Sequence, residues 1–352
     1  MRPLARACAT TGTLFAGGLT YAYLGLVALL TLGGFVAALV GGWWAPLIVV
    51  LTLLVVGYLL MKRGWLAEAT FDSTLYHKAP LDALNTGLDH VLCATDLQTA
   101  EHVYFSGAWV KSYRLGTGRT TGVSLARAVA SSAAFPGGFY PRRLSIKQMG
   151  FEHPEVIPSM LLTDGGVYDN MGTEWFTGGS GVQVASRKVD ELVVVNGSAG
   201  QPISKRSLLS IPIVGEFAEL MAVLMTTYDQ TTAVRRRWLH NRFNTDQQNG
   251  AIIQIERPAT MLPSQFAQYT DAKGERAKAA LQALETAGTA DAWAADAQAA
   301  AAIPTNLSAL GAETSARLIR HAYALTMANT HVLLNYPLRA IPDLAELQAW
   351  VR

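Results

Sequence analysis

The chain has 352 residues, of which 50% are hydrophobic and 15% are charged, with a formal net charge of +2. An ordinary soluble domain carries about 25% charged residues, so the composition excludes a disordered chain and indicates that part of this one lies in lipid or is buried on all sides. The near balance of 28 basic and 26 acidic residues gives no argument for a nucleic-acid partner, and two cysteines exclude both a disulfide framework and a four-cysteine zinc site.

An uncharged stretch covers residues 7–61, close to the start of the chain. It contains two apolar blocks, 14–40 and 43–61, and each has about the 20 residues that a membrane-spanning helix needs. Glycines, tryptophans and a proline separate the blocks at 41–46, which favours a turn at a membrane interface. We therefore expect a helical hairpin that crosses the bilayer twice.

Basic residues flank the expected hairpin on both sides, at Arg2, Arg6, Lys62 and Arg63, whereas the turn contains none. Because basic flanks remain on the cytoplasmic side, both ends of the hairpin are expected there. Two other interpretations are a cleaved signal peptide that begins with the two arginines, and a pair of buried helices in a soluble core.

The remaining sequence has the composition of a soluble α/β protein, and the chain length predicts roughly two units at about 150 residues each. We divide the chain into a transmembrane hairpin at 1–66 and a cytoplasmic α/β domain at 67–352. Strands are predicted at 90–95, 102–105, 160–163, 191–195 and 251–255. The first two form a β-hairpin around a turn, and the valine run of the fourth is typical of a strand buried on both faces.

Helices are predicted at 124–134, after Pro212 and at 277–302. Ser124 can cap the first, and Pro136 with the following glycines ends it. The long helix after Pro212 has one apolar face, made of Phe217, Leu220, Met221, Leu224, Met225 and Tyr228. This face predicts packing in the core, and its methionines make a lipid-contacting surface the alternative. Arg235–Arg237 at its end complements the helix dipole or contacts phospholipid headgroups.

The segment that bears most directly on chemistry is 161–170, Leu-Leu-Thr-Asp-Gly-Gly-Val-Tyr-Asp-Asn. Asp164 follows an apolar strand and precedes Gly165 and Gly166, which permit a tight turn and close backbone approach. Ligands bind at the carboxyl ends of strands in open α/β sheets, so this position suits a general base. A simple turn after a strand is the alternative interpretation.

Further segments stand in a defined order around this motif: Cys-Ala-Thr-Asp-Leu-Gln-Thr-Ala-Glu at 93–101, the small-residue segment 124–139, Asp-Gly-Gly-Val-Tyr-Asp-Asn-Met-Gly at 164–172, and Ile-Pro-Thr-Asn-Leu at 303–307 with the helix around 318–325. In this order and at these distances the set resembles the patatin-like phospholipase family over about residues 67–334. The resemblance implies a three-layer α/β/α domain with a mostly parallel sheet, and a lipid acyl hydrolase with a Ser-Asp dyad. It also implies that Asp164 is the base, that Gly165 and Gly166 complete its motif, and that Asn170 helps to fix the loop.

The nucleophile of that family stands in a G-x-S-x-G elbow after a glycine-rich oxyanion loop, and no G-x-S-x-G occurs in these 352 residues. We therefore expect an incomplete patatin-like domain that lacks its N-terminal nucleophile segment. The chain is then a truncated product, one part of a split enzyme whose separate N-terminal fragment carries the serine, or a non-catalytic protein that keeps the fold to bind lipid or a protein partner.

Three serines in this chain are alternative nucleophiles. Ser198, in Asn-Gly-Ser-Ala-Gly after a strand, resembles an elbow, and with a histidine such as His240 it predicts an unrelated α/β hydrolase. Ser124 opens a helix of small residues, and Ser180 lies in a glycine-rich loop with no strand before it. A nucleophile needs a base within hydrogen-bond reach and oxyanion donors, which the patterns around the last two do not indicate.

No histidine pair has the H-E-x-x-H spacing and there is no Cys-His cluster, so no metal site is predicted. No phosphate-binding loop or dinucleotide fingerprint follows a strand, so no cofactor is expected either. The expected partners are the membrane bilayer and a lipid ester substrate.

Overall fold

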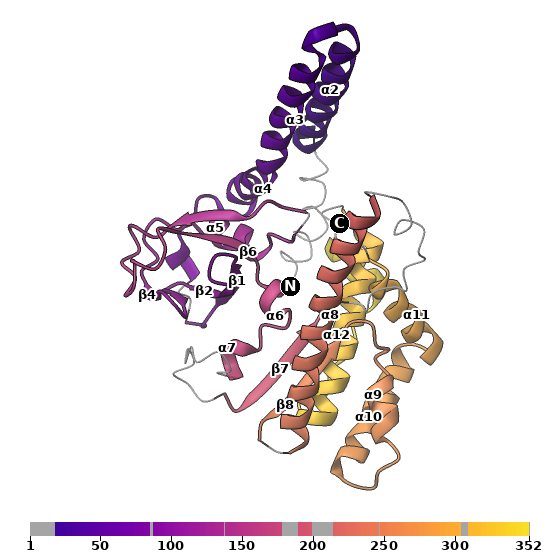
Figure 1. The fold of residues 1–352 in the computed structure, drawn as a ribbon. Coiled ribbons are helices and arrows are strands. Elements are labelled where there is room, and N and C mark those ends of the chain that lie inside the picture. Colours follow the sequence, from indigo (N-terminus) through magenta and orange to yellow (C-terminus); the bar gives the residue numbers. More distant parts are fainter. Residues whose placement is uncertain are drawn as a thin grey trace. The chain divides into compact units, whose positions relative to one another are not determined.

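The computed structural model describes residues 18–84, 87–136, 138–177, 189–198, 214–245, 247–303 and 309–351 (Figure 1). The chain divides into two compact units, one of residues 14–184 and one of residues 185–352 together with 1–13. Both units contain helices and strands, so the fold is mixed α/β.

An apolar helical hairpin begins the first unit. Helix α2 (Gly18–Val40) is joined to α3 (Ala45–Met61) by the 3-10 turn η1 (Gly42–Trp44). The two helices approach closely because Gly34 has no side chain, and a Cβ placed there would overlap Thr52. The packed hairpin agrees with the sequence prediction of two helices and a turn.

Only one continuous helical stretch among the described residues, Gly42–Tyr76, is long and apolar enough to cross a membrane by length and composition. No residue of its most apolar window is buried, and Gly25–Val40 is a shorter apolar helix beside it. The expected two-pass insertion stays a prediction.

Helix α4 (Arg63–Phe71) follows α3 after Lys62 and runs on into the π-helical turn η2 (Asp72–Tyr76). The predicted boundary between residues 66 and 67 thus falls inside a continuous helical stretch. Packing continues from the hairpin into the α/β part at Gly64, where an added Cβ would lie 2.8 Å from the carbonyl oxygen of Tyr140.

One carboxylate ties α4 to the α/β part of this unit. Glu68 accepts a hydrogen bond from Nε of Arg127 at 2.6 Å and forms a second ion pair with Arg142. The side chains of Glu68 and Arg142 are each only 12% exposed, so water screens these charges weakly. Charge-assisted hydrogen bonds of this kind are stronger than neutral ones, and they fix α4 against two further elements.

A six-stranded sheet forms the centre of the first unit, in the order β4-β3-β2-β1-β6-β5. Its strands are β1 (Val91–Asp96), β2 (Glu101–Ser106), β3 (Val110–Ser112), β4 (Gly116–Gly118), β5 (Arg142–Ser145) and β6 (Ser159–Asp164). The predicted hairpin of β1 and β2 is confirmed, with Cys93 opposite Tyr104.

The expected mostly parallel sheet is wrong for this unit, because every pairing within the six strands is antiparallel. Short connections join β1 to β2 and β2 to β3, and antiparallel strands need only such turns, whereas parallel neighbours require a crossover of about a dozen or more residues. Strand β6 also returns beside β1 in the antiparallel direction, with Asp164 opposite Ala94.

Apolar side chains from β1, β2 and β6 form the core of the first unit, including Val103, Phe105 and Leu162. Helix α5 (Leu125–Ser132) adds Ala128 to this core, and the 3-10 turn η3 (Leu81–Leu84) adds Leu81. The predicted helix cap is confirmed, since the Ser124 hydroxyl accepts a hydrogen bond from the Arg127 N–H at 3.1 Å.

The second unit contains a parallel pair of strands, β7 (Glu191–Asn196) and β8 (Asn249–Gln254), with α8 (Val214–Asn244) between them in sequence. Further helices follow: α9 (Met261–Phe266), α10 (Ala272–Ala287), α11 (Ala290–Ala301), α12 (Gly311–Leu334) and α13 (Leu344–Val351). Trp293, Leu284 and Leu325 are central to the core of this unit.

Three expectations for the second unit differ from the structure. Strand β7 is not buried on both faces, because Val193 and Val195 are 40% and 60% exposed while their neighbours are buried. On α8, Leu224 is exposed, so this part of the predicted apolar face lies outside the core. The predicted helix 277–302 is two helices separated at Gly288.

The ion pairs of Glu68 make a testable contribution to stability. We expect Glu68→Gln to lower the free energy of unfolding by about 2 kcal/mol, because it leaves two arginine charges weakly hydrated and uncompensated. Thermal unfolding of the purified chain in detergent, followed by circular dichroism, measures this loss. Arg114→Gln is the control, since it breaks an ion pair with Glu101 in which the arginine is 57% exposed, and should cost less than about 0.5 kcal/mol. Equal losses would contradict the assigned role of Glu68.

Candidate functional site

Asp164 is the last residue of β6, at the point where the chain leaves the sheet. The sequence predicts it one residue after the strand, and the structure extends the strand to include it. It continues the row of Met160 and Leu162, whose side chains are buried in the core. Its carboxylate is therefore partly withdrawn from water and lies at a strand end, as predicted.

The environment of the Asp164 carboxylate favours proton binding. Its Oδ1 accepts a hydrogen bond from the N–H of Gly166 at 2.7 Å. Burial raises the pKa of Asp164 above its ordinary value, and the Gly166 hydrogen bond lowers it in part. A carboxylate whose pKa moves toward neutrality is a better proton acceptor under physiological conditions.

Backbone hydrogen bonds hold Asp164 from two sides. Its N–H donates to the carbonyl of Ala134 at 3.1 Å, and the N–H of Gly165 donates to the carbonyl of Ser132 at 3.3 Å. On the other side, the hydroxyl of Thr95 in β1 donates to the Asp164 carbonyl at 2.9 Å. The C-terminal end of α5 and strand β1 therefore fix the position from which the carboxylate extends.

Both glycines of the motif have a defined place. A Cβ at Gly165 would overlap the carbonyl oxygen of Cys93, so only glycine allows this close approach. Gly166 opens the one-turn helix α6 (Gly166–Asp169) and supplies the N–H that contacts Asp164. Asn170 directly follows α6, and its expected role in fixing the loop stays a prediction.

A neighbouring carboxylate, which the sequence reasoning missed, holds the loop after α6. Asp169 is buried and accepts hydrogen bonds from the N–H groups of Met171 and Glu174 at 3.1 and 2.8 Å. The Thr173 hydroxyl also donates to it, at 3.3 Å. The sequence feature that indicates these hydrogen bonds is an acidic residue within a turn of small and polar residues, which is a weak signal.

An aromatic cluster lies on the first unit, and sequence reasoning missed it as well. Nδ1 of His102 lies 2.7 Å from the hydroxyl of Tyr104, and the His102 ring lies 4.1 Å from that of Tyr168. Trp175, from α7 (Glu174–Thr177), contacts Tyr104 and stacks on Trp109 with ring centres 5.1 Å apart. The β1–β2 register predicts that His102 and Tyr104 share a sheet face, but not which segment covers them.

Cys93 borders this cluster and is a poor nucleophile. Burial, together with the negative charge of Asp169, raises the pKa of the Cys93 thiol to about 12. Only a thiolate attacks an ester readily, so the thiol is inert at neutral pH.

Asp96 is a second buried carboxylate with a structural place. Its oxygens accept hydrogen bonds from the N–H groups of Gln98 and Leu161 at 3.2 and 2.9 Å, and from the Thr99 hydroxyl at 2.9 Å. It therefore joins the β1–β2 turn to β6, and this role accounts for its burial without chemistry.

The alternative nucleophiles lie in different settings. Ser124 is the cap of α5, as described above. Ser198 follows β7 in the second unit, where its N–H donates to Oδ1 of Asn196 at 3.0 Å. His240 lies near the end of α8 and is exposed. Ser180 lies outside the described residues.

Of the cavities that described residues line, we consider two, and Asp164 is not among the residues that line either of them. One of about 550 Å³ lies at the base of the hairpin, between α2 and α4. The other, of about 100 Å³, lies between α11 and α12. Beside the second, buried Asp296 forms ion pairs with Arg317 at 3.4 Å and Arg320 at 3.6 Å, which join the two helices.

Among the residues that the structure describes, no group of three or more His, Cys, Asp and Glu side chains is arranged to hold a metal ion. Comparison of the chain with protein-family models, with curated proteins and with solved structures finds no match.

The raised pKa of Asp164 predicts a pH-dependent effect on stability. The Asp164 carboxyl binds its proton more tightly in the folded chain than in the unfolded chain, where its pKa is about 3.9. Below that pKa the group is protonated in both states and its ionisation costs no stability. Above both pKa values it is ionised in both states, and the ionisation lowers the free energy of unfolding. Asp164→Asn keeps the acceptor oxygen for Gly166, and should raise the melting temperature at pH 7 but not at the acidic end of the range. Asp89→Asn, at an exposed position, controls for the lost charge. A melting temperature lowered equally at every pH would contradict this assignment.

Proposed function

We propose that this chain is the membrane-anchored part of a patatin-like lipid acyl hydrolase, with Asp164 as its general base. The observation that supports the proposal most directly is the carboxylate of Asp164 at a strand end, partly desolvated and oriented by the N–H of Gly166. The order of the sequence segments around the motif supports the family assignment. We further propose that residues 67–352 form one patatin-like α/β domain.

The proposed reaction is acyl transfer from a lipid ester through a serine. The serine oxygen attacks the ester carbonyl carbon while the carboxylate of Asp164 takes the hydroxyl proton, and that proton leaves with the alcohol. Water then attacks the acyl-serine carbonyl carbon and gives a proton to the same carboxylate. The bond to the serine oxygen breaks, the carboxylate returns that proton to the serine oxygen, and the fatty acid is released. The raised pKa supports this role, because it brings the base closer to the working pH.

The serine in this proposal comes from another segment or another chain, since these 352 residues contain no G-x-S-x-G. That same observation favours a second candidate function, a non-catalytic membrane protein that keeps the fold to bind lipid or a protein. Both candidate functions include the membrane hairpin, and they differ in whether a nucleophilic serine lies within hydrogen-bond reach of Asp164.

We also propose that the hairpin crosses the bilayer twice and that both of its ends are cytoplasmic. The apolar surface of α2 and α3 and the basic residues Lys62 and Arg63 support this orientation. The hairpin would then keep the α/β part at the surface from which lipid substrates are taken.

Hydrolysis of a short-chain p-nitrophenyl ester tests the proposed function. The chain alone should show no hydrolysis above background, whereas co-expression with the segment encoded directly upstream should restore it. Asp164→Asn should then lower the rate by about a hundredfold or more, since the amide cannot accept the serine proton. Asp89→Asn, an exposed carboxylate, should leave the rate unchanged.

Robust hydrolysis by the chain alone that disappears in Ser198→Ala would overturn this account in favour of an unrelated hydrolase. Binding of lipid without hydrolysis under either condition, with a folded complex, would favour the non-catalytic candidate instead.

Cysteine labelling tests the orientation of the hairpin. In a background without the two native cysteines, an impermeant maleimide added to intact cells should label Trp43→Cys in the turn. Lys62→Cys should react only after the cells are opened, because the basic flank lies inside. Labelling of Lys62→Cys in intact cells would show that the orientation is wrong.

A further inference from the structure

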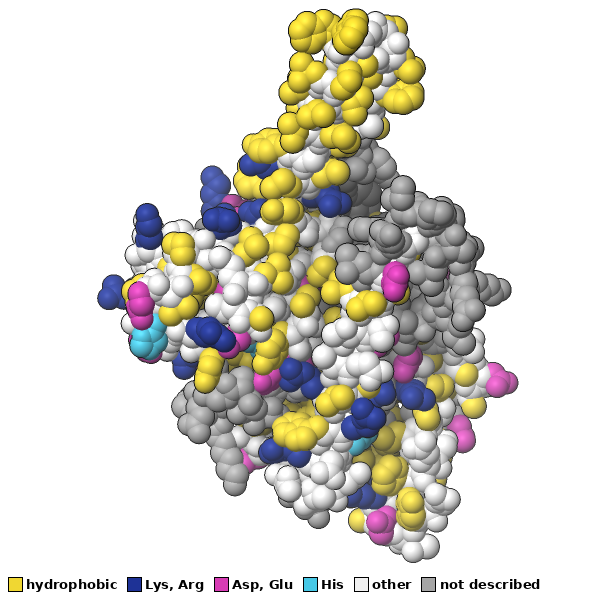
Figure 2. All heavy atoms as spheres, in the orientation of Figure 1, with side chains coloured by type: hydrophobic (Ala, Val, Ile, Leu, Met, Phe, Trp, Pro, Cys, Tyr) yellow, Lys and Arg dark blue, Asp and Glu magenta, His cyan; other side chains and the backbone are white. Residues whose placement is uncertain are grey.

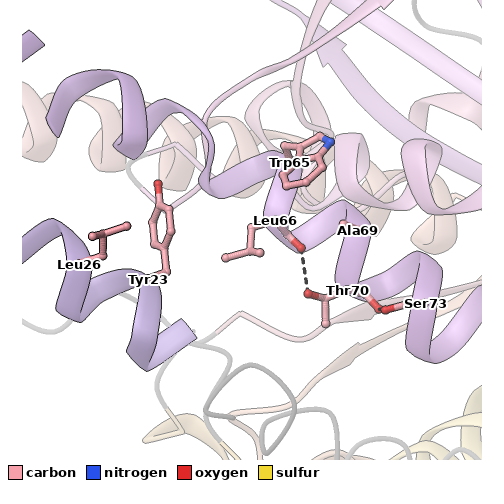
Figure 3. A pocket seen from close by; sticks show the side chains of 7 residues that line it. All are labelled: Tyr23, Leu26, Trp65, Leu66, Ala69, Thr70 and Ser73. Carbon is pink, nitrogen blue, oxygen red and sulfur yellow. Dashed lines mark hydrogen bonds between the residues drawn. The ribbon is translucent and has the colours of Figure 1, made fainter. Parts of the chain in front are cut away.

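A groove at the base of the hairpin has no role in the proposed hydrolysis. We call it the base groove; it measures about 550 Å³ and is lined by Tyr23, Leu26, Trp65, Leu66, Ala69, Thr70 and Ser73. Figure 3 shows that these side chains come from α2 on one side and from α4 with the following turn on the other. Its volume is within the range of about 300–1,000 Å³ that is typical of small-molecule sites.

The lining of the base groove offers mostly hydrocarbon, because the hydroxyls of Thr70 and Ser73 are bonded to the helix backbone. The Thr70 hydroxyl donates to the Leu66 carbonyl at 2.8 Å, and the Ser73 hydroxyl donates to the Thr70 carbonyl at 3.2 Å. Both hydroxyls therefore satisfy the helix backbone, and Leu26, Leu66 and Ala69 supply hydrocarbon. Such a surface suits an acyl chain better than a polar ligand.

Basic side chains lie beside this apolar surface. Lys62 and Arg63 separate α3 from the residues of α4 that line the groove. Nζ of Lys62 lies 4.9 Å from the centre of the Tyr58 ring, and Nε of Arg63 donates to the Leu60 carbonyl at 3.0 Å. Figure 2 shows Lys and Arg side chains around the base of the apolar hairpin. The charge at this level complements an anionic headgroup.

In the proposed membrane insertion, the base groove lies at the level of the lipid headgroups. Helix α3 has 17 residues and is therefore about 25 Å long, close to the thickness of a bilayer hydrocarbon core of about 30 Å. Trp43 and Trp44 are 99% and 68% exposed at its far end, and Trp65 is 56% exposed just beyond its near end. Tryptophans at both ends of an apolar stretch are typical of the two membrane interfaces.

One polar atom of the lining lacks a protein partner. The hydroxyl of Tyr23 is shielded from solvent and has no hydrogen-bond partner within the described part of the chain. A phosphate or ester oxygen of a bound lipid would accept the hydrogen bond that this hydroxyl can donate.

We infer that the base groove binds one anionic glycerophospholipid from the surrounding leaflet. One acyl chain lies against Leu26, Leu66 and Ala69, and the phosphate lies at the level of Lys62 and Arg63. This inference rests on the membrane insertion included in the proposed function, but not on hydrolysis.

Fluorescence quenching by brominated lipid tests the inference on the full chain in bilayers. Two bilayers of phosphatidylcholine and phosphatidylglycerol are compared, with bromine on the acyl chains of one lipid or of the other. The signal of Trp65 is taken as the difference between the wild type and Trp65→Phe. We expect bromine on phosphatidylglycerol to quench this signal at least twofold more strongly than bromine on phosphatidylcholine.

Variants separate a bound lipid from general contact with the bilayer. Ala69→Phe fills the base groove and should abolish the excess quenching, whereas Ala108→Phe, at an exposed position between β2 and β3, should leave it unchanged. Replacing Lys62 and Arg63 by glutamine should equalise the two lipids. Asp164→Asn should have no effect, which separates this site from the hydrolysis.

Equal quenching of Trp65 by both lipids in the wild type, or full excess quenching in Ala69→Phe, would overturn the inference. The signals of Trp43 and Trp44, obtained with their own Phe variants, report insertion separately. If neither lipid quenches them, the hairpin is not in the bilayer and the membrane part of the proposed function fails too.

Discussion

The carboxylate of Glu68 on α4 joins the end of the apolar hairpin to the α/β part of the first unit. Its two oxygens contact Arg127 next to the α5 cap and Arg142 at the start of β5, so one side chain of α4 joins elements far apart in the sequence. Glu68 and Arg142 are largely withdrawn from water, so removing either partner leaves an uncompensated charge there. The last residue of α5, Ser132, and Ala134 just beyond the helix supply the carbonyls that bind the backbone of Gly165 and Asp164. The hairpin and the candidate site therefore depend on the same support.

At Asp164, folding stability and the proposed role as a general base make opposite demands on the pKa. Packing the strand end beside Met160 and Leu162 withdraws the carboxylate from water, which disfavours its charge and raises its pKa. A proton acceptor benefits from a raised pKa, and groups with a perturbed pKa gather at functional sites for this reason. Gly165 shows how tightly the position is constrained, since the Cys93 carbonyl leaves no room for a side chain.

Features encoded by neighbouring residues could be predicted from the sequence. The hairpin helices, the Ser124 cap, the β1–β2 hairpin and the strand before Asp164 each depend on a local pattern of apolar, capping or turn residues. The antiparallel pairing of β6 with β1 could not be predicted, because more than sixty residues lie between the two strands. Thr95 and Asp164, which are joined by a hydrogen bond, are 69 residues apart in the sequence. The partners of Glu68 and the covering of His102 by Tyr168 are long-range in the same sense, and no periodicity in the sequence indicates them.

The helical stretch from Gly42 to Tyr76 runs from the apolar α3 through a turn residue at Lys62 into α4 and η2. The tilt of a helix that spans a bilayer changes with the thickness of the hydrocarbon layer. In the proposed membrane insertion, α3 leads into α4, and the contacts of Glu68 connect α4 to α5, whose end binds the backbone around Asp164.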